Sequence, residues 1–316
     1  MAETLRTWPA LDLEASGPVP EDAGERVALA IDDAAAVAVE HDDDRRWRVY
    51  FATSQDRLHA ASLLRASLGG AFTIASLDVP DEGWATKVQS VLRAVKVGRL
   101  IVCPPWDVPS LPPPGELVVV IEPSTGFGTG HHQSTRLCLL ALQRLALGGT
   151  VRPGVRDTEP GATETHAHQA MWNEFGLGLR GCRVVDVGTG SGVLAIAARL
   201  LGASDVLAID NDADAVASAR ENAARNGASE GIAFATVDLA ALRTGAGDVV
   251  LANLTALLLR RLAAPLGGLV APGGYLVTSG FTFDQVAMVT DAFPDFDVEA
   301  REDEDDWVGL TLRRAR

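Results

Sequence analysis

Positive charge, cysteine and long apolar runs are all scarce in this 316-residue sequence. Its 27 lysines and arginines stand against 42 aspartates and glutamates, which gives a net charge of −15. Nucleic acid binds to basic surfaces, so we expect no direct contact with DNA or RNA. An acidic surface attracts a basic protein, but it also serves solubility alone. The charge by itself leaves these two interpretations open.

The three cysteines, Cys103, Cys138 and Cys182, are far apart in the sequence. They form neither a C-x-x-C pair nor a zinc spacing, so we expect reduced, mostly buried thiols and no metal site. No segment approaches the roughly 20 consecutive apolar residues that a membrane span requires. Residues 1–6 lack the apolar core of a signal peptide. We therefore expect a soluble, cytoplasmic protein that does not contact membranes.

The first 80 residues predict a small α+β domain of the ferredoxin-like type. Their pattern has the order strand, helix, strand, strand, helix, strand, which matches that fold. The expected strands are 8–14, 35–39, 47–51 and 72–79, and the expected helices are 20–30 and 55–68. Residues 81–115 are expected to connect this domain to a second one, through a helix at 81–92, a strand at 97–103 and a proline-rich linker.

Residues 116–316 predict an α/β domain in which strands and helices alternate. A strand at 116–122 and a helix at 133–147 come first, and a loop at 148–181 then interrupts the pattern. The later strands are expected at 184–187, 206–209, 232–237, 249–252, 275–279 and 307–312, and the helices at 193–201, 213–226, 256–266 and 283–293. Such alternation implies a parallel, doubly wound, Rossmann-like sheet. Two strands after residue 295 have no helix between them, which predicts the antiparallel edge typical of class I methyltransferases.

The most informative segment is the run VVDVGTGSG at 184–192, followed downstream by LAID at 207–210. An apolar strand stops at a glycine-rich turn, a helix begins, and a second apolar strand ends in a carboxylate. Glycines let the backbone approach a ligand closely, and a carboxylate suits a ribose diol. The glycines fall as G-x-G-x-G, and position 193 is valine where a dinucleotide motif has glycine. This spacing suits S-adenosylmethionine, which has no pyrophosphate to place at a helix N-terminus.

Two polar residues at strand ends are the strongest candidates for contacting that ligand. Asp210 can accept two hydrogen bonds from a ribose diol, or it can cap the helix that follows. Asn253 offers an acceptor and a donor at the end of the fourth strand, or it is a turn-forming residue that caps the next helix. Because ligands of such sheets bind at the carboxyl ends of the strands, we favour the binding role for both.

The segment TGFGTGHHQST at 125–135 is the second unusual feature. Hydroxyls and backbone amides where a helix starts would make a polar lid over a ligand. His131 and His132 have no nearby acid or cysteine to complete a metal site, so we expect them to be hydrogen-bonding loop residues.

Together these motifs resemble those of the bacterial methyltransferases that modify ribosomal protein L eleven, the PrmA type. The family's motifs and their positions here are F-G-T-G-x-H-x-T-T at 127–135, D-x-G-x-G-S-G-I-L-A-I-A at 186–197, I-D-x-D-x-x-A-V…N-A…N-G from 209 to 227, A-N-I-L at 252–255 and P-G-G-x-L-x-x-S-G at 272–280. The F-G-T-G segment is not general to methyltransferases, which makes the combination specific.

The resemblance implies that S-adenosylmethionine binds against Thr135, Gly188, Asp210 and Asn253, and the glycine turn adds Gly190. It implies a substrate-recognition domain at 1–80 and a methyltransferase domain at 116–316 with the inserted loop 148–181. It also implies methyl transfer to lysine side chains and the N-terminal amine of a basic partner, a large-subunit ribosomal protein. Asn253 and residues 129–135 are our candidates for orienting that amine. We expect the enzyme to be a monomer.

Three other functions are compatible with parts of this pattern. The same chemistry could act on another protein lysine or on a small-molecule amine. A nicotinamide-dependent dehydrogenase is disfavoured by the glycine spacing and by the antiparallel edge. A binding module without catalysis is disfavoured because Gly188, Asp210 and Asn253 are all present.

Overall fold

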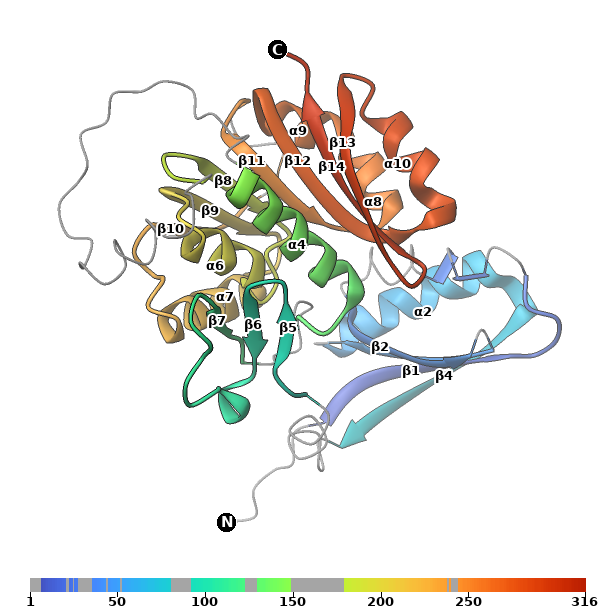
Figure 1. The fold of residues 1–316 in the computed structure, drawn as a ribbon. Coiled ribbons are helices and arrows are strands. Elements are labelled where there is room, and N and C mark those ends of the chain that lie inside the picture. Colours follow the sequence, from blue (N-terminus) through green and yellow to red (C-terminus); the bar gives the residue numbers. More distant parts are fainter. Residues whose placement is uncertain are drawn as a thin grey trace. The chain divides into compact units, whose positions relative to one another are not determined.

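The computed structural model describes residues 7–20, 23–24, 26–27, 36–43, 45–51, 53–80, 92–122, 130–148, 179–237, 239 and 244–316. The chain divides into two compact units, one of residues 1–91 with 125–127 and one of residues 92–124 with 128–316 (Figure 1). Several expected features lie outside the described residues, namely most of helix 20–30, nearly all of helix 81–92, residues 125–129 and most of loop 148–181. No described helix is long and apolar enough to cross a membrane.

The first unit contains a four-stranded sheet with the order β2-β3-β1-β4, in which all neighbours are antiparallel. Its elements are β1 (Thr7–Ala15), β2 (Ala36–Asp43), β3 (Arg46–Phe51), α2 (Ser54–Leu68), a 3₁₀ turn η1 (Gly69–Ala71) and β4 (Phe72–Pro80). Thr53 caps the start of α2 by accepting the Asp56 N–H, and Gly69 ends the helix with a φ of 59°. The four expected strands and helix 55–68 are confirmed.

The second unit is built on a seven-stranded sheet with the order β10-β9-β8-β11-β12-β14-β13. Its strands are β8 (Arg183–Val187), β9 (Asp205–Asp210), β10 (Ile232–Thr236), β11 (Gly247–Asn253), β12 (Val270–Thr282), β13 (Phe296–Glu304) and β14 (Trp307–Arg314). The neighbours from β10 to β12 are parallel, whereas β14 is antiparallel to both β12 and β13. The predicted parallel sheet with an antiparallel edge is confirmed.

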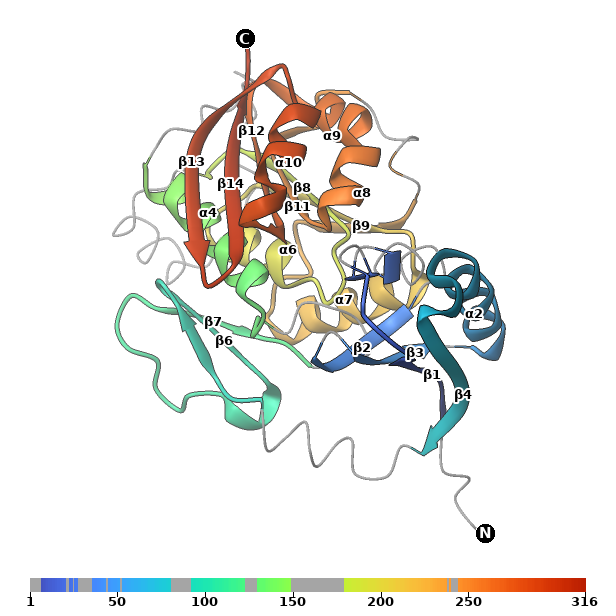
Figure 2. The same ribbon diagram turned by 90° about the vertical axis from the view of Figure 1, so that its right-hand side faces the viewer.

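Helices cover both faces of this sheet, as Figures 1 and 2 show. They are α4 (Gln133–Gly148), α6 (Val193–Leu200), α7 (Ala213–Arg225), α8 (Ala256–Arg261), α9 (Ala263–Leu269) and α10 (Val286–Ala292), the last preceded by η4 (Phe283–Gln285). Successive strand residues belong to opposite cores: Val184 packs with α4, α6 and α7, and Val185 packs with α8, α9 and α10. Burial on both faces explains why the strands are continuous apolar runs.

The structure corrects two of the expected elements. The strand expected at 97–103 is a hairpin of β5 (Val95–Val97) and β6 (Leu100–Cys103), which turns at Gly98 with a φ of 58°. A parallel partner, β7 (Leu117–Val120), completes a three-stranded sheet in the second unit. The helix expected at 256–266 is broken at Leu262. Pro265 has no N–H to donate to the carbonyl of Arg261, so a continuous helix is disfavoured there.

Candidate functional site

The glycine turn follows β8 and brings the backbone into a conformation that other residues rarely adopt. Gly188, Gly190 and Gly192 have φ values of 69°, 51° and 83°. The turn is closed by a hydrogen bond from the Gly192 N–H to the Thr189 carbonyl, at 2.8 Å. A Cβ atom on Gly188 would lie 2.8 Å from Cδ2 of Leu254, the end of a flexible side chain, so the positive φ is the stronger reason for glycine there. The turn therefore has a fixed shape, and a neighbouring group can approach its backbone closely.

Asp210 ends β9 beside this turn. Its Oδ2 accepts the Gly190 N–H at 3.0 Å, and its Oδ1 accepts the Asp212 N–H at 3.1 Å. The cap of α7 is Asp212, which accepts the Asp214 N–H, so the helix-cap alternative for Asp210 does not hold. Each carboxylate oxygen keeps further acceptor capacity after these bonds. Asp210 thus joins two adjacent strand ends through the glycine turn.

Asp186 is a buried acid within the same motif, and the sequence pattern alone gave it no separate role. Its side chain is 1% exposed, and its Oδ2 accepts Oγ1 of Thr189 at 2.7 Å and the Ala195 N–H at 3.1 Å. Its Oδ1 has no hydrogen-bond partner among the described residues. Burial raises the pKa of Asp186 to about 7, against the two hydrogen bonds, which lower it. Through these two hydrogen bonds, the Asp186 side chain links the glycine turn to the first turn of α6.

Asn253 ends β11 and meets the first turn of α4. Its Nδ2 donates to Oγ1 of the fully buried Thr135, at 3.3 Å. Its Oδ1 is buried and has no partner among the described residues. The cap of α8 is Thr255, whose hydroxyl accepts the Leu258 N–H, so Asn253 is not the helix cap. An orphaned buried acceptor costs stability unless a ligand donates to it.

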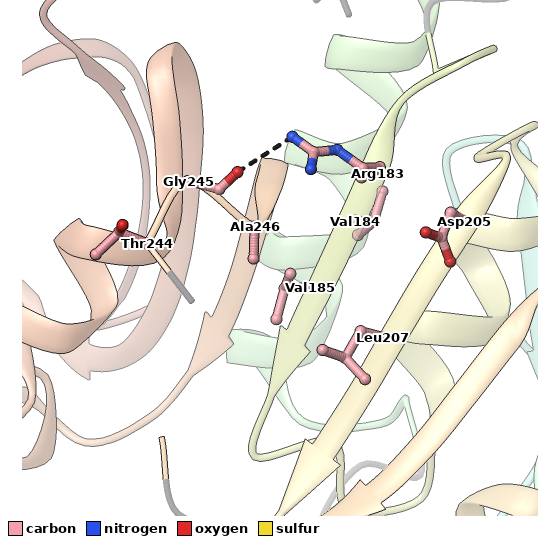
Figure 3. Close-up of a pocket in the computed structure, with 8 residues that line it drawn as sticks. All are labelled: Arg183, Val184, Val185, Asp205, Leu207, Thr244, Gly245 and Ala246. Atoms are coloured by element: carbon pink, nitrogen blue, oxygen red, sulfur yellow. Dashed lines mark hydrogen bonds between the residues drawn. The ribbon is translucent and has the colours of Figure 1, made fainter. Parts of the chain in front are cut away.

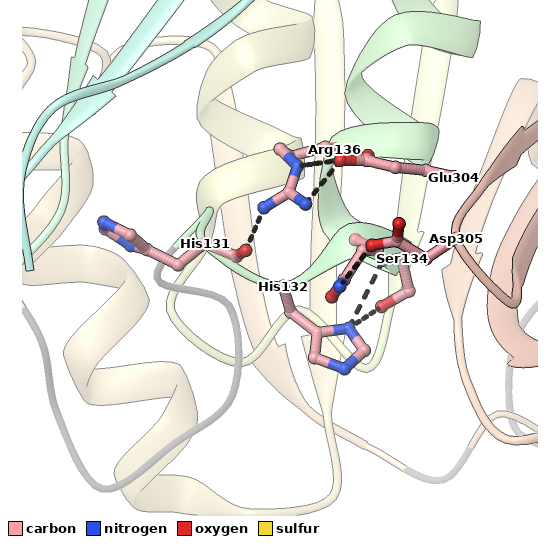
Figure 4. Close-up of polar contacts among 7 residues, drawn as sticks. His131, His132, Ser134, Arg136, Glu304 and Asp305 are labelled. Atoms are coloured by element: carbon pink, nitrogen blue, oxygen red, sulfur yellow. Dashed lines mark hydrogen bonds and ion pairs between the residues drawn. The ribbon is translucent and has the colours of Figure 1, made fainter.

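The start of α4 is held by the hairpin of β13 and β14 (Figure 4). Arg136 donates to both carboxylate oxygens of Glu304, at 2.9 and 3.1 Å from Nε. Gln133 donates to Asp305 at 3.0 Å, and the ring of His132 packs edge-on against Trp307 with 4.4 Å between centroids. These contacts fix the helical turn that carries Thr135.

His132 lies within this contact network. Its Nδ1 is 2.8 Å from Oγ of Ser134, and burial, together with the charge of Arg136, lowers the pKa of its imidazole. The described residues contain no group of three or more histidine, cysteine, aspartate or glutamate side chains suited to a metal ion.

The five predicted positions meet at one edge of the sheet. Gly190 binds Asp210, Gly188 lies against Leu254, and Asn253 binds Thr135. This is the carboxyl edge of β8, β9 and β11, where ligands of doubly wound sheets bind. Residues 123–129, which include most of the predicted lid, lie outside the described residues.

A depression of about 300 Å³ lies at the other edge (Figure 3). Its described lining comes from the starts of β8 and β9, including Arg183 and Asp205, and from residues 244–246. Arg183 closes one side by donating to the Gly245 carbonyl at 3.1 Å. None of the five predicted site residues contributes to this lining, so it is separate from the strand-end site.

The sequence profile described as Ribosomal protein L11 methyltransferase (PrmA) matches residues 10–315 of this chain. The chain belongs to this family. The resemblance expected from the motifs is therefore confirmed, and with it the α/β class I methyltransferase fold and S-adenosylmethionine as the cofactor. A nicotinamide-dependent dehydrogenase is excluded by the same finding.

Individual relatives agree with this assignment. The chain is 38% identical over 234 residues to the ribosomal protein L11 methyltransferase of Geotalea daltonii, covering 73% of this chain and 67% of the relative. It is 40% identical over 214 residues to that of Geobacter metallireducens, covering 67% of this chain but only 59% of the relative. The crystal structure of ribosomal protein L11 methylase from Lactobacillus delbrueckii subsp. bulgaricus superposes with a TM-score of 0.55 at 28% identity, covering 71% of this chain and 100% of that one.

Proposed function

We propose that this methyltransferase transfers the methyl group of S-adenosylmethionine to lysine side chains and the N-terminal amine of a ribosomal protein of the L11 type. The relatives named for that activity support the acceptor, and the net charge of −15 suits a basic protein partner. The observation that carries the proposal is the buried Oδ1 of Asn253, which has no hydrogen-bond partner among the described residues and lies at the edge where Asp210 and the glycine turn meet.

The residues at this edge fit the cofactor. Gly188 and Gly190 have no side chain, so the cofactor's amino-acid part can approach the backbone of the turn closely. The Asp210 carboxylate, already oriented by two backbone N–H groups, accepts the ribose hydroxyls. Thr135 and Asn253 complete the binding set. The bound cofactor supplies a methyl group activated by the positive charge of its sulfonium, so the protein needs no covalent intermediate.

The remaining task of the protein is to present a neutral amine in line with the methyl group. A lysine has an ordinary pKa of about 10.4, and transfer into a less polar site lowers it. Asn253 accepts one N–H of the amine through Oδ1, and its bond to Thr135 fixes the plane of the amide. The network around Arg136 and Glu304 holds Thr135 in place and thereby keeps Asn253 oriented.

We further propose that residues 1–80 are a ferredoxin-like domain that recognises the protein substrate. The strand order β2-β3-β1-β4, with α2 between β3 and β4, supports this fold. Residues 81–115 would connect it to the methyltransferase domain 116–316, with 148–181 as an insertion. We propose that the protein acts in the cytoplasm and as a monomer. Size-exclusion chromatography coupled to light scattering would check the oligomeric state.

The acceptor is tested with labelled S-adenosylmethionine. The purified protein is incubated separately with purified ribosomal protein L11, with whole cell lysate and with a mixture of small-molecule amines, and labelled products are identified by mass spectrometry. We expect label on lysines and the N-terminus of the ribosomal protein. Label mainly on another protein or on a small amine would overturn the proposed acceptor. Cofactor binding with no labelled product would favour a binding module instead.

A further inference from the structure

The N-A…N-G part of the family motif has no role in the cofactor site described above. Its two asparagines, Asn222 and Asn226, lie one turn apart at the C-terminal end of α7. Residues four apart on a helix share one face, so the two side chains point the same way. Asn222 is fully buried at 0% exposure. A buried amide must have hydrogen-bond partners, and those partners indicate what the motif does.

Asn226 and Asn222 pair with the free edge of β7. One edge of β7 and of the residues that follow it pairs with β6, as in the hydrogen bond from the Ile121 N–H to the Cys103 carbonyl at 2.9 Å. On the α7 side, the Asn226 amide accepts the Val120 N–H and donates to the Val120 carbonyl, both at 2.7 Å. Asn222 then accepts the Glu122 N–H at 2.9 Å. The two amides take the place of a neighbouring strand.

Asn222 makes one contact that Asn226 does not. Its Nδ2 donates to the Ser191 carbonyl at 3.0 Å, inside the glycine turn. One turn earlier on α7, Ala219 packs against Gly192, where an added Cβ would lie 3.0 Å from Cβ of Ala219. One buried side chain therefore joins the glycine turn to Glu122.

We propose that Asn222 is a positioning residue for cofactor binding, which fixes the carbonyl of Ser191 and thereby the glycine turn against the end of β7. It acts through the turn and does not contact the cofactor. This inference rests on the placement of the cofactor at the glycine turn. Asn226 makes two backbone contacts to the same segment and Asn222 makes one, but only Asn222 reaches the glycine turn, so Asn226 separates this role from general support of the fold.

The test compares Asn222→Asp with Asn226→Asp in the full-length protein. Each exchange keeps an acceptor oxygen and replaces the donor NH₂ group with an oxygen. Asn222 is fully buried and Asn226 is half-buried, so the melting temperatures report the larger cost of a carboxylate at position 222 separately from any loss of affinity. Binding of S-adenosylhomocysteine is measured by calorimetry at pH 8, alongside the melting temperature. We expect affinity to fall about tenfold for Asn222→Asp, as for a loss of one oriented contact, and to change less than about twofold for Asn226→Asp.

A change of pH gives a readout that a purely structural role would not move. Burial raises the pKa of a carboxyl group, so a lower pH favours the protonated Asn222→Asp side chain, whose O–H can donate to the carbonyl of Ser191. We expect its affinity, relative to the wild type at the same pH, to recover at pH 6. A deficit that is equal at pH 6 and pH 8 would overturn the donor role.

Two further outcomes decide the proposal. Wild-type affinity in folded Asn222→Asp, or an equal loss in both variants, overturns it. If Asn222→Asp does not fold, Asn222→Ala and Asn226→Ala repeat the comparison without a buried charge, with the same expected order. Asp210→Ala is measured in parallel: unchanged affinity there contradicts the cofactor placement itself, whereas a loss there with none in the Asn222 variants contradicts only the positioning role.

Discussion

At the scale of single residues, two carboxyl groups at the glycine turn have opposite environments. Asp210 is half-buried and keeps acceptor capacity toward the strand-end site, whereas Asp186 is enclosed and holds the turn from within. Motif spacing identified Asp210 because a carboxylate after the second strand is a local signal. The burial of Asp186 also depends on β9 and β11, which flank β8 in the sheet, and the segment that carries the motif does not encode this pairing.

Removing the carboxylate of Asp210 should weaken cofactor binding. Hydrogen bonds to a charged acceptor are worth about 1.5–3 kcal/mol each, so Asp210→Ala should lower the affinity for S-adenosylhomocysteine by at least about tenfold. Calorimetry measures this directly. The matched control is Asp212→Ala, which removes the cap of α7 and should cost about 1 kcal/mol of stability without changing affinity. Unchanged affinity in Asp210→Ala would refute the ribose assignment.

Asp186 should make folding stability depend on pH. Its pKa is raised to about 7 in the folded protein from about 3.9 unfolded, so the native state binds the extra proton. Its contribution is fully present below about pH 4 and is lost as pH rises toward 7. Asp186→Asn stays neutral, so its free energy of unfolding should rise relative to the wild type by a few kcal/mol between pH 4.5 and 7.5. Urea unfolding at several pH values checks this, and a constant difference would contradict it.

At the scale of secondary-structure elements, the hairpin of β13 and β14 supports the site through α4. Arg136 and Glu304 are 168 residues apart in the sequence, so no local pattern could reveal their contact. The helix and both strands were predictable from periodicity, but not which of them touch. The same limit applies to β5 and β6, where the apolar run at 100–103 concealed the turn at Gly98.

Breaking the contact between the hairpin and α4 should reduce turnover. Glu304→Gln removes the charge that Arg136 binds, so Thr135 and Asn253 lose part of their orientation. We expect a loss of about 1 kcal/mol of stability and a severalfold lower kcat, with a smaller change in affinity for S-adenosylhomocysteine. Asp303→Asn is the control, because its pair with Arg301 lies on the exposed surface. Equal effects of the two exchanges would contradict the supporting role.

At the scale of the whole molecule, the sequence predicted the strands and helices of the large sheet, but not the order of every strand or the break within a helix. Alternating strands and helices implied the parallel sheet, and the glycine turn predicted which edge of it binds the ligand. Burial of apolar side chains on both faces makes these signals strong. The position of β14 between β12 and β13, and the break before Pro265, arise from packing and from one missing N–H, which a periodic pattern does not register.

The net charge of −15 should make substrate capture sensitive to salt. Attraction between an acidic enzyme and a basic ribosomal protein is screened as ionic strength rises. We expect KM for the protein acceptor to increase several-fold between about 50 and 300 mM salt, while affinity for S-adenosylhomocysteine changes little. Steady-state kinetics across this range measure the effect. An unchanged KM would indicate that the acidic surface serves solubility alone.

The most direct measurement is a crystal structure of the complex with S-adenosylhomocysteine. We expect the ribose hydroxyls on the carboxylate of Asp210, the amino-acid part against Gly188 and Gly190, and the sulfur facing the side of Asn253. A ligand bound instead in the depression beside Arg183 and Asp205, or one that leaves Asp210 uncontacted, would contradict this placement of the cofactor.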